Sequence, residues 1–307
     1  MSGQAIKSSL PILGKDAEKY SADIVNAFTS LNIHACTLGS TGKKLPTEYS
    51  GDIDIAVELE FNDDNIEFIK NNIIYKLSLN KENTEINVLT GFKILSFGFV
   101  YKAYDALFPQ TVQVDLMFTD DINYSKFMYH SPNYKNKESN FKGLYRTNLL
   151  CCLAGRSFNK LPDIDNSTGE ILTYWKYTLT YDRGLVLTHK SYIGKYKLLK
   201  NPVTIKNDEK FITKDINEII KIVLGEKATI DDVNSFESLI NFIFSDKYKF
   251  AENKKIIYNV ISDFIEDKRH ETKLLSIIKY INKVINNKPN EVTLYKDNLM
   301  KVICNNI

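Results

Sequence analysis

The chain has 307 residues, which is enough for one large domain or two ordinary domains with buried cores. Its apolar fraction of 43% and charged fraction of 25% are typical of a soluble globular protein. The net charge of +2 is too small to indicate nucleic-acid binding by itself. No apolar run approaches the ~18 residues of a membrane-spanning helix, so we expect no membrane partner.

The cysteines and the first residues bear on the compartment. Cys36, Cys151, Cys152 and Cys304 form no CxxC pair and no metal-ligand spacing, which favours reduced thiols. The first 20 residues contain no apolar core long enough for a secretory signal. We therefore expect a cytoplasmic protein.

Hydrophobic periodicity in the first third of the chain predicts alternating helices and strands. Apolar residues recur at helical spacing in 16–31 and 65–79. Strands are predicted, in chain order, at 33–39, 52–59, 92–104 and 111–119. This order of elements predicts an α+β fold in which a mixed sheet has helices packed on one side.

The remainder of the chain has a different character. The stretch 141–158 is predicted to be helical, and 171–192 is rich in β-branched and aromatic residues around Asp182-Arg183-Gly184, which predicts a β-hairpin. Beyond Pro202 we predict successive amphipathic helices. The predicted division is a first domain at 1–125, an extension of one helix and a hairpin at 126–200, and an α-helical domain at 201–307.

The segment from Gly39 to Lys43, Gly-Ser-Thr-Gly-Lys, looks at first like a phosphate-binding P-loop. That loop needs four residues between its glycines, followed by Lys and then Ser or Thr. Here two residues separate Gly39 from Gly42, and Lys43 is followed by Lys44. The spacing therefore excludes a P-loop.

Three carboxylates suggest a different chemistry. Asp52 and Asp54 alternate with apolar residues on one predicted strand, so both point to the same face. Asp115 has a similar setting on a later strand, and if the two strands are neighbours the three carboxylates converge. Carboxylates that close repel one another unless a cation lies between them, and Mg²⁺ prefers carboxylate oxygens together with substrate phosphates. Gly39 and Ser40 end the preceding strand, where backbone N–H groups could approach a triphosphate.

Leu38-Gly39-Ser40, then Asp52-Ile53-Asp54 and later Gln113-Val114-Asp115-Leu116, together resemble the polymerase-β-type nucleotidyltransferase superfamily. The resemblance covers roughly residues 16–120. It implies Mg²⁺ or Mn²⁺ bound at Asp52, Asp54 and Asp115, with Asp115 assisting an acceptor hydroxyl. Such enzymes transfer a nucleoside monophosphate from an NTP and release pyrophosphate.

The resemblance also assigns roles to the predicted domains. It makes 1–125 the catalytic core and 126–200 an extension that completes the nucleotide and acceptor cleft. The stretch 113–150 further resembles uncharacterised phage and viral members of the superfamily, which would place the protein in a host cytoplasm.

Basic side chains offer candidate nucleotide contacts. Lys142 and Arg146 lie four residues apart, so on a helix they share one face, which is either a cationic clamp for the triphosphate or a solvated surface. Lys43 and Lys44 follow the Gly39-Ser40 turn, where a solvated loop is the favoured interpretation. The basic, aromatic hairpin at 171–192 either stacks nucleic-acid bases or forms a partly buried aromatic sheet, and the second is favoured.

The sequence therefore favours a metal-dependent nucleotidyltransferase. An RNA 3′ end, such as that of tRNA, is the preferred acceptor, because the hairpin is basic and aromatic and the C-terminal half is helical. Two alternatives stay open. One is transfer to a protein or small-molecule hydroxyl, as in a toxin or defence factor. The other is a non-catalytic nucleotide- or RNA-binding module, against which the three intact carboxylates argue.

Overall fold

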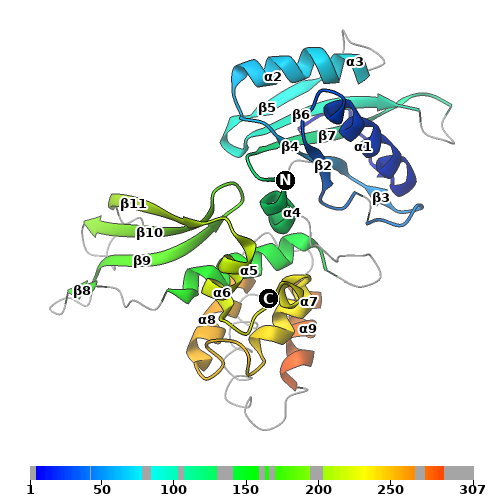
Figure 1. Ribbon diagram of the computed structural model, residues 1–307. Coiled ribbons are helices and arrows are strands. Elements are labelled where there is room, and N and C mark those ends of the chain that lie inside the picture. The colour runs from blue at the N-terminus through cyan, green and yellow to red at the C-terminus, as the bar shows by residue number, and fades with distance from the viewer. Residues whose placement is uncertain are drawn as a thin grey trace. The chain divides into compact units, whose positions relative to one another are not determined.

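The computed structural model describes residues 5–41, 43–77, 84–102, 107–129, 141–158, 163–165, 170–193, 203–266 and 274–286. In 163–165, 170–172, 191–193 and 203–207 only the backbone is described. The chain divides into two compact units, residues 1–140 and 141–307 (Figure 1).

The first unit is built on a five-stranded mixed sheet. Its strands, in spatial order, are β2 (Ala35–Leu38), β4 (Asp52–Glu58), β7 (Gln110–Thr119), β6 (Ile94–Tyr101) and β5 (Ile86–Leu89). The central pair, β4 and β7, is parallel, and the other neighbours are antiparallel. A separate two-stranded pair joins β1 (Ile12–Leu13) to β3 (Tyr49–Ser50).

Two helical segments cover one face of this sheet. They are α1 (Gly14–Thr29) and α2 (Asp63–Ile69), and α2 continues through a π-helical turn at Lys70–Ile74 into α3 (Tyr75–Leu77) (Figure 1). Alternate strand residues and the inner faces of these helices form one apolar core, which includes Ile24, Phe28, Ile53, Ile55, Val57, Ile66, Phe97, Val114 and Leu116. The predicted mixed sheet is confirmed, and the two helical segments that were predicted pack on one side of it.

A further helix, α4 (Ile122–Tyr129), was not among the predicted elements. It contacts β2 and β4. Lys126 of α4 acts electrostatically on the Cys36 thiol, and Cys36 pairs with Ala56 on the face of β4 that also carries Asp54. The helix therefore lies on the sheet face opposite the apolar core. Because α4 crosses residue 125, it places 126–129 in the first unit.

The second unit contains a four-stranded antiparallel sheet. In spatial order its strands are β11 (Val203–Thr213), β10 (Gly184–Ile193), β9 (Glu170–Thr180) and β8 (Asp163–Asp165). The register of β9 and β10 confirms the hairpin predicted around Asp182-Arg183-Gly184. The expectation of helix directly after Pro202 is wrong for β11, which pairs with β10 along its length.

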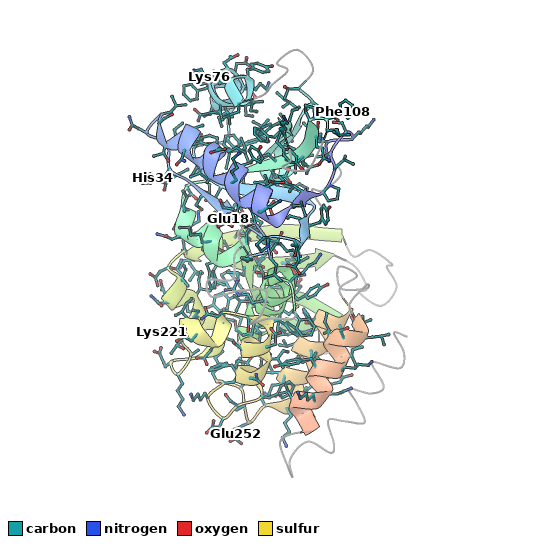
Figure 2. All side chains as sticks on the ribbon, turned by 90° about the vertical axis from the view of Figure 1, so that its right-hand side faces the viewer. Glu18, His34, Lys76, Phe108, Lys221 and Glu252 are labelled. Carbon is teal, nitrogen blue, oxygen red and sulfur yellow. The ribbon has the colours of Figure 1, made fainter. Side chains whose placement is uncertain are left out.

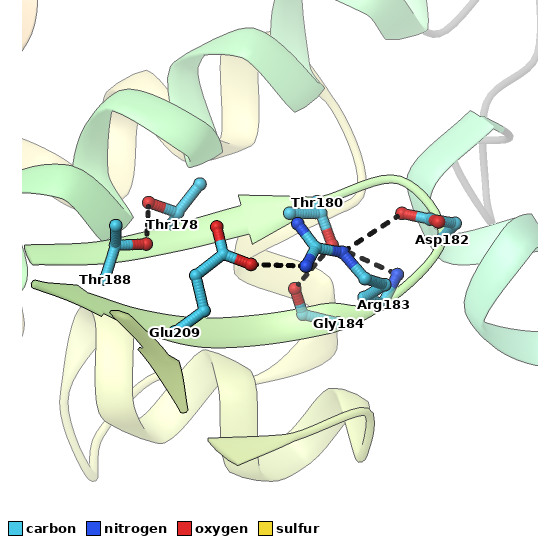
Figure 3. A network of polar contacts seen from close by, with 7 residues as sticks. All are labelled: Thr178, Thr180, Asp182, Arg183, Gly184, Thr188 and Glu209. Atoms are coloured by element: carbon cyan, nitrogen blue, oxygen red, sulfur yellow. Dashed lines mark hydrogen bonds and ion pairs between the residues drawn. The ribbon is translucent and has the colours of Figure 1, made fainter. Parts of the chain in front are cut away.

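Polar contacts close the β9–β10 turn (Figure 3). The backbone N–H of Arg183 donates to the Thr180 hydroxyl (3.0 Å), and that hydroxyl donates to the carbonyl of Gly184 (3.1 Å). The Arg183 guanidinium pairs with Glu209 of β11, so an ion pair also links the turn to the strand on the other side of β10.

Five α-helices complete the described part of the second unit. They are α5 (Gly143–Ser157), α6 (Ile216–Leu224), α7 (Phe236–Ile243), α8 (Lys254–Ile265) and α9 (Leu274–Asn286). Side chains of Asp215, Ser235 and Asn253 accept hydrogen bonds at the starts of α6, α7 and α8, respectively. These caps explain where the predicted amphipathic helices begin.

Charged side chains project from the surfaces of both units. Figure 2 labels six exposed residues, which are Glu18, His34, Lys76, Phe108, Lys221 and Glu252.

Within the described residues, no helix combines the length and apolar character needed to cross a membrane.

The hairpin turn depends on one glycine, which gives a stability prediction. Gly184 has φ = 82°, and a Cβ there would lie 2.4 Å from the Thr213 carbonyl oxygen. We expect Gly184→Ala to reduce the free energy of unfolding by about 1–3 kcal/mol, because strain and overlap add. Urea and thermal unfolding measure this change.

Gly155→Ala is the matched control, because Gly155 lies in α5 and its added Cβ would meet only the Tyr177 carbonyl at 4.0 Å. The control should be neutral or slightly stabilising. Equal stability of both variants would contradict the strain assigned to Gly184.

Candidate metal centre

Strand register brings the three predicted carboxylates together. Asp54 of β4 lies directly opposite Asp115 of the parallel strand β7, and Asp52 precedes Asp54 on the same face. One carboxylate oxygen from each of the three lies within 4.8 Å of the others. The predicted convergence is confirmed, while the role of these residues as metal ligands stays a prediction.

Asp115 is fixed by two neutral donors. It is fully buried, and its Oδ1 accepts hydrogen bonds from the Ser96 hydroxyl (2.6 Å) and from Gln113 Nε2 (2.9 Å). Gln113 Nε2 also lies 3.1 Å from Oδ2. Ser96 is the residue of β6 directly opposite Asp115, so the hydrogen bond follows from the register. A carboxylate oxygen accepts about two hydrogen bonds, so Oδ2 keeps acceptor capacity toward the other carboxylates.

The environment of Asp54 favours a positive ligand. Burial raises the pKa of this carboxyl well above its usual value, and the nearby Asp52 and Asp115 carboxylates raise it further. Lys43, beyond the Gly39-Ser40 turn, lowers the same pKa without reversing the shift. The ionised cluster therefore has more negative charge than its protein surroundings offset, and a bound cation would relieve this.

Gly39 allows the chain to pass directly over Asp54. Its φ is 65°, and a Cβ added there would lie 2.2 Å from Asp54 Oδ2. Leu38 pairs with Asp54 in the β2–β4 register, so the strand end and the carboxylate are held against each other. A glycine is therefore required at this position for the carboxylate cluster to keep its shape, independently of any role in nucleotide binding.

Ser40 is tied to the start of β4 through a second serine. The Ser50 hydroxyl donates to the Asp52 carbonyl (3.0 Å), and the Ser40 and Ser50 hydroxyls are 2.9 Å apart. Because Ser50 has one proton and a carbonyl only accepts, Ser40 must donate to Ser50. While Ser40 donates its proton to Ser50, its oxygen can only accept hydrogen bonds from other groups.

These donors fit Mg²⁺ or Mn²⁺. All three ligands are carboxylates, which both ions prefer over softer donors. Sites that bind two such ions hold them about 4 Å apart, a spacing that carboxylates clustered within 4.8 Å can bridge. Because the pKa of Asp54 is raised, its ionised form is disfavoured, and binding of a cation would stabilise the ionised cluster.

The predicted cationic clamp has a different setting, in the second unit. Lys142 is exposed and precedes the first turn of α5. Arg146 is only 1% exposed, and its Nε donates to the Val233 carbonyl (2.7 Å) while Nη1 donates to the Thr147 hydroxyl (3.3 Å). These contacts give Arg146 a packing role between α5 and the turn that contains Val233. The clamp stays a prediction, and for Arg146 it would require the loss of a buried hydrogen bond.

Two residues of the site were not singled out from the sequence. Ser96 stands alone among apolar residues in β6, and Gln113 alternates with valines in β7. An isolated polar residue within an apolar strand is the available signal, since a buried polar group needs a partner. The identity of that partner depends on strand pairing, which the sequence alone does not supply.

Comparisons with known proteins add little to this geometry. No family model and no curated protein matches the sequence. Among solved structures, a Leishmania infantum polymerase beta ternary gap complex has 12% identity and a TM-score of 0.33, covering 57% of this chain and 51% of that one. A ternary P/T complex of the same polymerase has 11% identity and a TM-score of 0.33, covering 63% of each chain. Similarity at this level does not establish a family or an activity for this chain.

The contact between Gly39 and Asp54 gives a prediction about metal binding. Gly39→Ala places a Cβ against Asp54 Oδ2 and strains a positive φ, so it should displace the carboxylate. We expect the affinity for Mn²⁺ to fall by at least tenfold, measured by electron paramagnetic resonance titration. Gly51→Ala is the control, because its Cβ would meet nothing within 4 Å. Unchanged Mn²⁺ affinity in Gly39→Ala would contradict the assigned contact.

The raised pKa of Asp54 gives a prediction about stability and pH without metal. A raised folded-state pKa favours the protonated group, so the stability it contributes is present below the usual value of 3.8 and is lost as pH rises through the folded-state pKa. In EDTA at neutral pH, Asp54→Asn should therefore melt at a higher temperature than the wild type. The difference should vanish at pH values below 3.8.

Asp23→Asn is the control for the loss of one negative charge, since Asp23 is exposed on α1. It should leave the melting temperature unchanged across the same pH range. A wild type that melts no lower than Asp54→Asn at neutral pH would contradict the unfavourable burial of this charge.

Proposed function

We propose that the protein is a nucleotidyltransferase that depends on Mg²⁺ or Mn²⁺. It transfers a nucleoside monophosphate from an NTP to an acceptor hydroxyl and releases pyrophosphate. The observation that carries this proposal is the cluster of Asp52, Asp54 and Asp115, whose oxygens lie within 4.8 Å of one another on one sheet face.

The burial of these carboxylates argues against a structural role for this cluster. Asp115 is fully buried, and Asp54 titrates at a raised pKa because burial and its neighbours disfavour its charge. Such an arrangement costs stability in the metal-free protein. A perturbed carboxylate cluster of this kind is typical of a functional site.

Each residue has a distinct task in the proposed reaction. Asp52, Asp54 and Asp115 would hold the divalent ions against the triphosphate, and Gly39 lets the backbone approach the same point. When bound, the ions supply Lewis-acid stabilisation of the phosphoryl oxygens. Asp115 would accept the proton of the acceptor hydroxyl at Oδ2, because its Oδ1 already accepts from Ser96 and Gln113.

The bonds of the reaction balance with these groups. The acceptor oxygen forms a bond to the α-phosphorus of the NTP, and the bond from that phosphorus to the bridging oxygen of the β-phosphate breaks. Pyrophosphate leaves with the electrons of the broken bond, and the hydroxyl proton passes to Asp115 or to water. Nothing is oxidised or reduced.

The acceptor follows from the sequence rather than from the site. We favour an RNA 3′ end, such as that of tRNA, because the β9–β10 hairpin combines aromatic and basic residues. The Lys176 ammonium lies 6.0 Å from the Tyr174 ring centroid, and Trp175 stacks on His189 with centroids 4.2 Å apart. All four side chains are partly exposed, which supports a surface able to contact bases. Protein and small-molecule hydroxyls are the alternative acceptors.

The test uses the full chain with Mg²⁺ or Mn²⁺, each of the four α-labelled NTPs, and separate pools of RNA, protein and small-molecule hydroxyl acceptors. We expect one NTP to label the RNA pool. Asp52→Asn combined with Asp54→Asn should reduce labelling by at least 100-fold, because the ions lose their ligands while side-chain volume is nearly preserved.

Asp23→Asn is again the matched control and should transfer normally. Labelling that persists in the double variant would contradict the assigned metal ligands. If the wild type labels no acceptor under any combination of nucleotide and metal, the proposal is wrong.

A further inference from the structure

We propose that the segment of residues 5–13, called here the N-terminal segment, positions Asp115 by way of Gln113. The carboxylate site then has its working shape only while this segment is docked on the sheet. This inference rests on the proposed function, because it assigns a positioning role around the same metal site. Gln113 would be a positioning residue that need not contact metal or nucleotide.

Hydrogen bonds attach the N-terminal segment to the sheet at several points. The backbone N–H of Ile6 donates to Gln113 Oε1 (3.0 Å), and that of Leu10 donates to the Thr111 carbonyl (2.8 Å). Between them, the backbone N–H of Lys7 donates to Glu85 Oε1 (3.2 Å). The segment then continues into β1, where Ile12 pairs with Ser50 of β3.

The glycine at position 98 makes room for the N-terminal segment, because it has no side chain. Gly98 of β6 is the register partner of Gln113, on the face opposite the apolar core. A Cβ on Gly98 would lie 3.1 Å from Thr111 Cγ2 and 3.3 Å from Ile6 Cγ2. Ile6 is 1% exposed, so its side chain is buried against this glycine. The glycine and the isoleucine together set where the segment crosses the strands.

The Gln113 amide connects the docked segment to the carboxylate. Its oxygen accepts from the Ile6 N–H, and its nitrogen donates to both oxygens of Asp115, at 2.9 and 3.1 Å. The reverse orientation of the amide would place its oxygen against the carboxylate and its NH₂ group against a backbone N–H, so the two contacts fix the orientation jointly. Because both hydrogen bonds belong to one rigid amide plane, loss of the Ile6 contact removes a constraint on the direction in which that plane holds Asp115.

This support leaves the charge of Asp115 intact. Gln113 and Ser96 are both neutral donors, so they fix the direction of the carboxylate without neutralising it. Hydrogen-bonding partners of metal ligands commonly contribute about 10- to 100-fold to metal affinity or activity. We expect an effect in that range from Gln113, and a similar one from the contact that orients it.

The start of the N-terminal segment lies outside the apolar core, whereas Ile12 near its end belongs to that core. Ile6 lies outside the apolar core that joins α1 and α2 to the strands, and Gly98 and Gln113 lie on the opposite face. A change at Ile6 should therefore alter the site more than the stability of the unit. This separation makes the inference testable by substitution.

The experiment compares Mn²⁺ affinity, by electron paramagnetic resonance titration, in two pairs of full-length variants. Gln113→Met removes the amide at similar volume, and Gln110→Met makes the same change in the same strand, where Gln110 accepts from the Tyr101 hydroxyl. Ile6→Ala removes the buried anchor, and Leu10→Ala makes a comparable truncation in the same segment, where Leu10 is 53% exposed. Thermal unfolding accompanies each titration.

We expect Gln113→Met and Ile6→Ala each to weaken Mn²⁺ binding by about 10- to 100-fold, and the two controls to bind as the wild type does. Wild-type affinity in Gln113→Met would overturn the inference and leave the proposed function standing. A loss in Gln113→Met without one in Ile6→Ala would overturn the part played by the N-terminal segment. A wild type that binds no Mn²⁺ would instead refute the metal site, and the proposed function with it.

A measurement on the wild type alone covers the case in which a variant fails to fold. If docking favours metal binding, metal binding must favour docking by the same factor. Adding Mn²⁺ should therefore slow amide hydrogen exchange in residues 6–10 more than in α2, which lies on the other face of the sheet. Equal slowing in both segments, or none, would contradict the coupling.

Discussion

The constraint on which the first unit depends is that one sheet face carries three carboxylates while the other carries the apolar core. On β4, Asp52 and Asp54 alternate with Ile53 and Ile55, which are fully buried in that core. A shift of the strand by one residue would bury the carboxylates among apolar side chains and expose the isoleucines. The core therefore fixes the register, and the register places Asp54 opposite Asp115.

The free-energy cost of burying these carboxylates close together accounts for the kinds of residue around them. Burial raises the pKa of Asp54, and the nearby Asp52 and Asp115 carboxylates raise it further. Within the described part of the chain, the side chains that donate hydrogen bonds to Asp115 are those of Ser96 and Gln113, which are neutral. Neutral donors orient a carboxylate and leave its charge available to a ligand. Gly39 keeps the Asp54 carboxylate in place, because a Cβ at residue 39 would overlap the Asp54 oxygen.

Much of this arrangement could be predicted from the sequence, because it follows from local alternation. The period of two places Asp52 and Asp54 on one face, which the structure bears out. The β-branched and aromatic residues around Asp182-Arg183-Gly184 predict the β9–β10 hairpin, which is also confirmed. Features that depend on pairing could not be predicted. The partner of Gln113 lies 107 residues away at Ile6. In β11, five consecutive polar residues, Lys206 to Lys210, erase the alternation that would have indicated a strand. Arg146 is buried despite its charge because carbonyl and hydroxyl acceptors meet it inside the second unit.

The site is thus assembled from parts of the chain that meet only when the sheet is complete. Residues 5–13, 39–40, 50–54, 96–98 and 113–115 each contribute a contact that another part needs. A transfer reaction gains most from groups already held in place when charge develops, because no reorganisation is then needed. Gly39, Ser96, Gln113 and the docked Ile6 supply that fixed geometry without supplying positive charge. In the proposed reaction the protein would hold the shape of the site, and divalent ions would supply the positive charge that the site needs beyond that of Lys43.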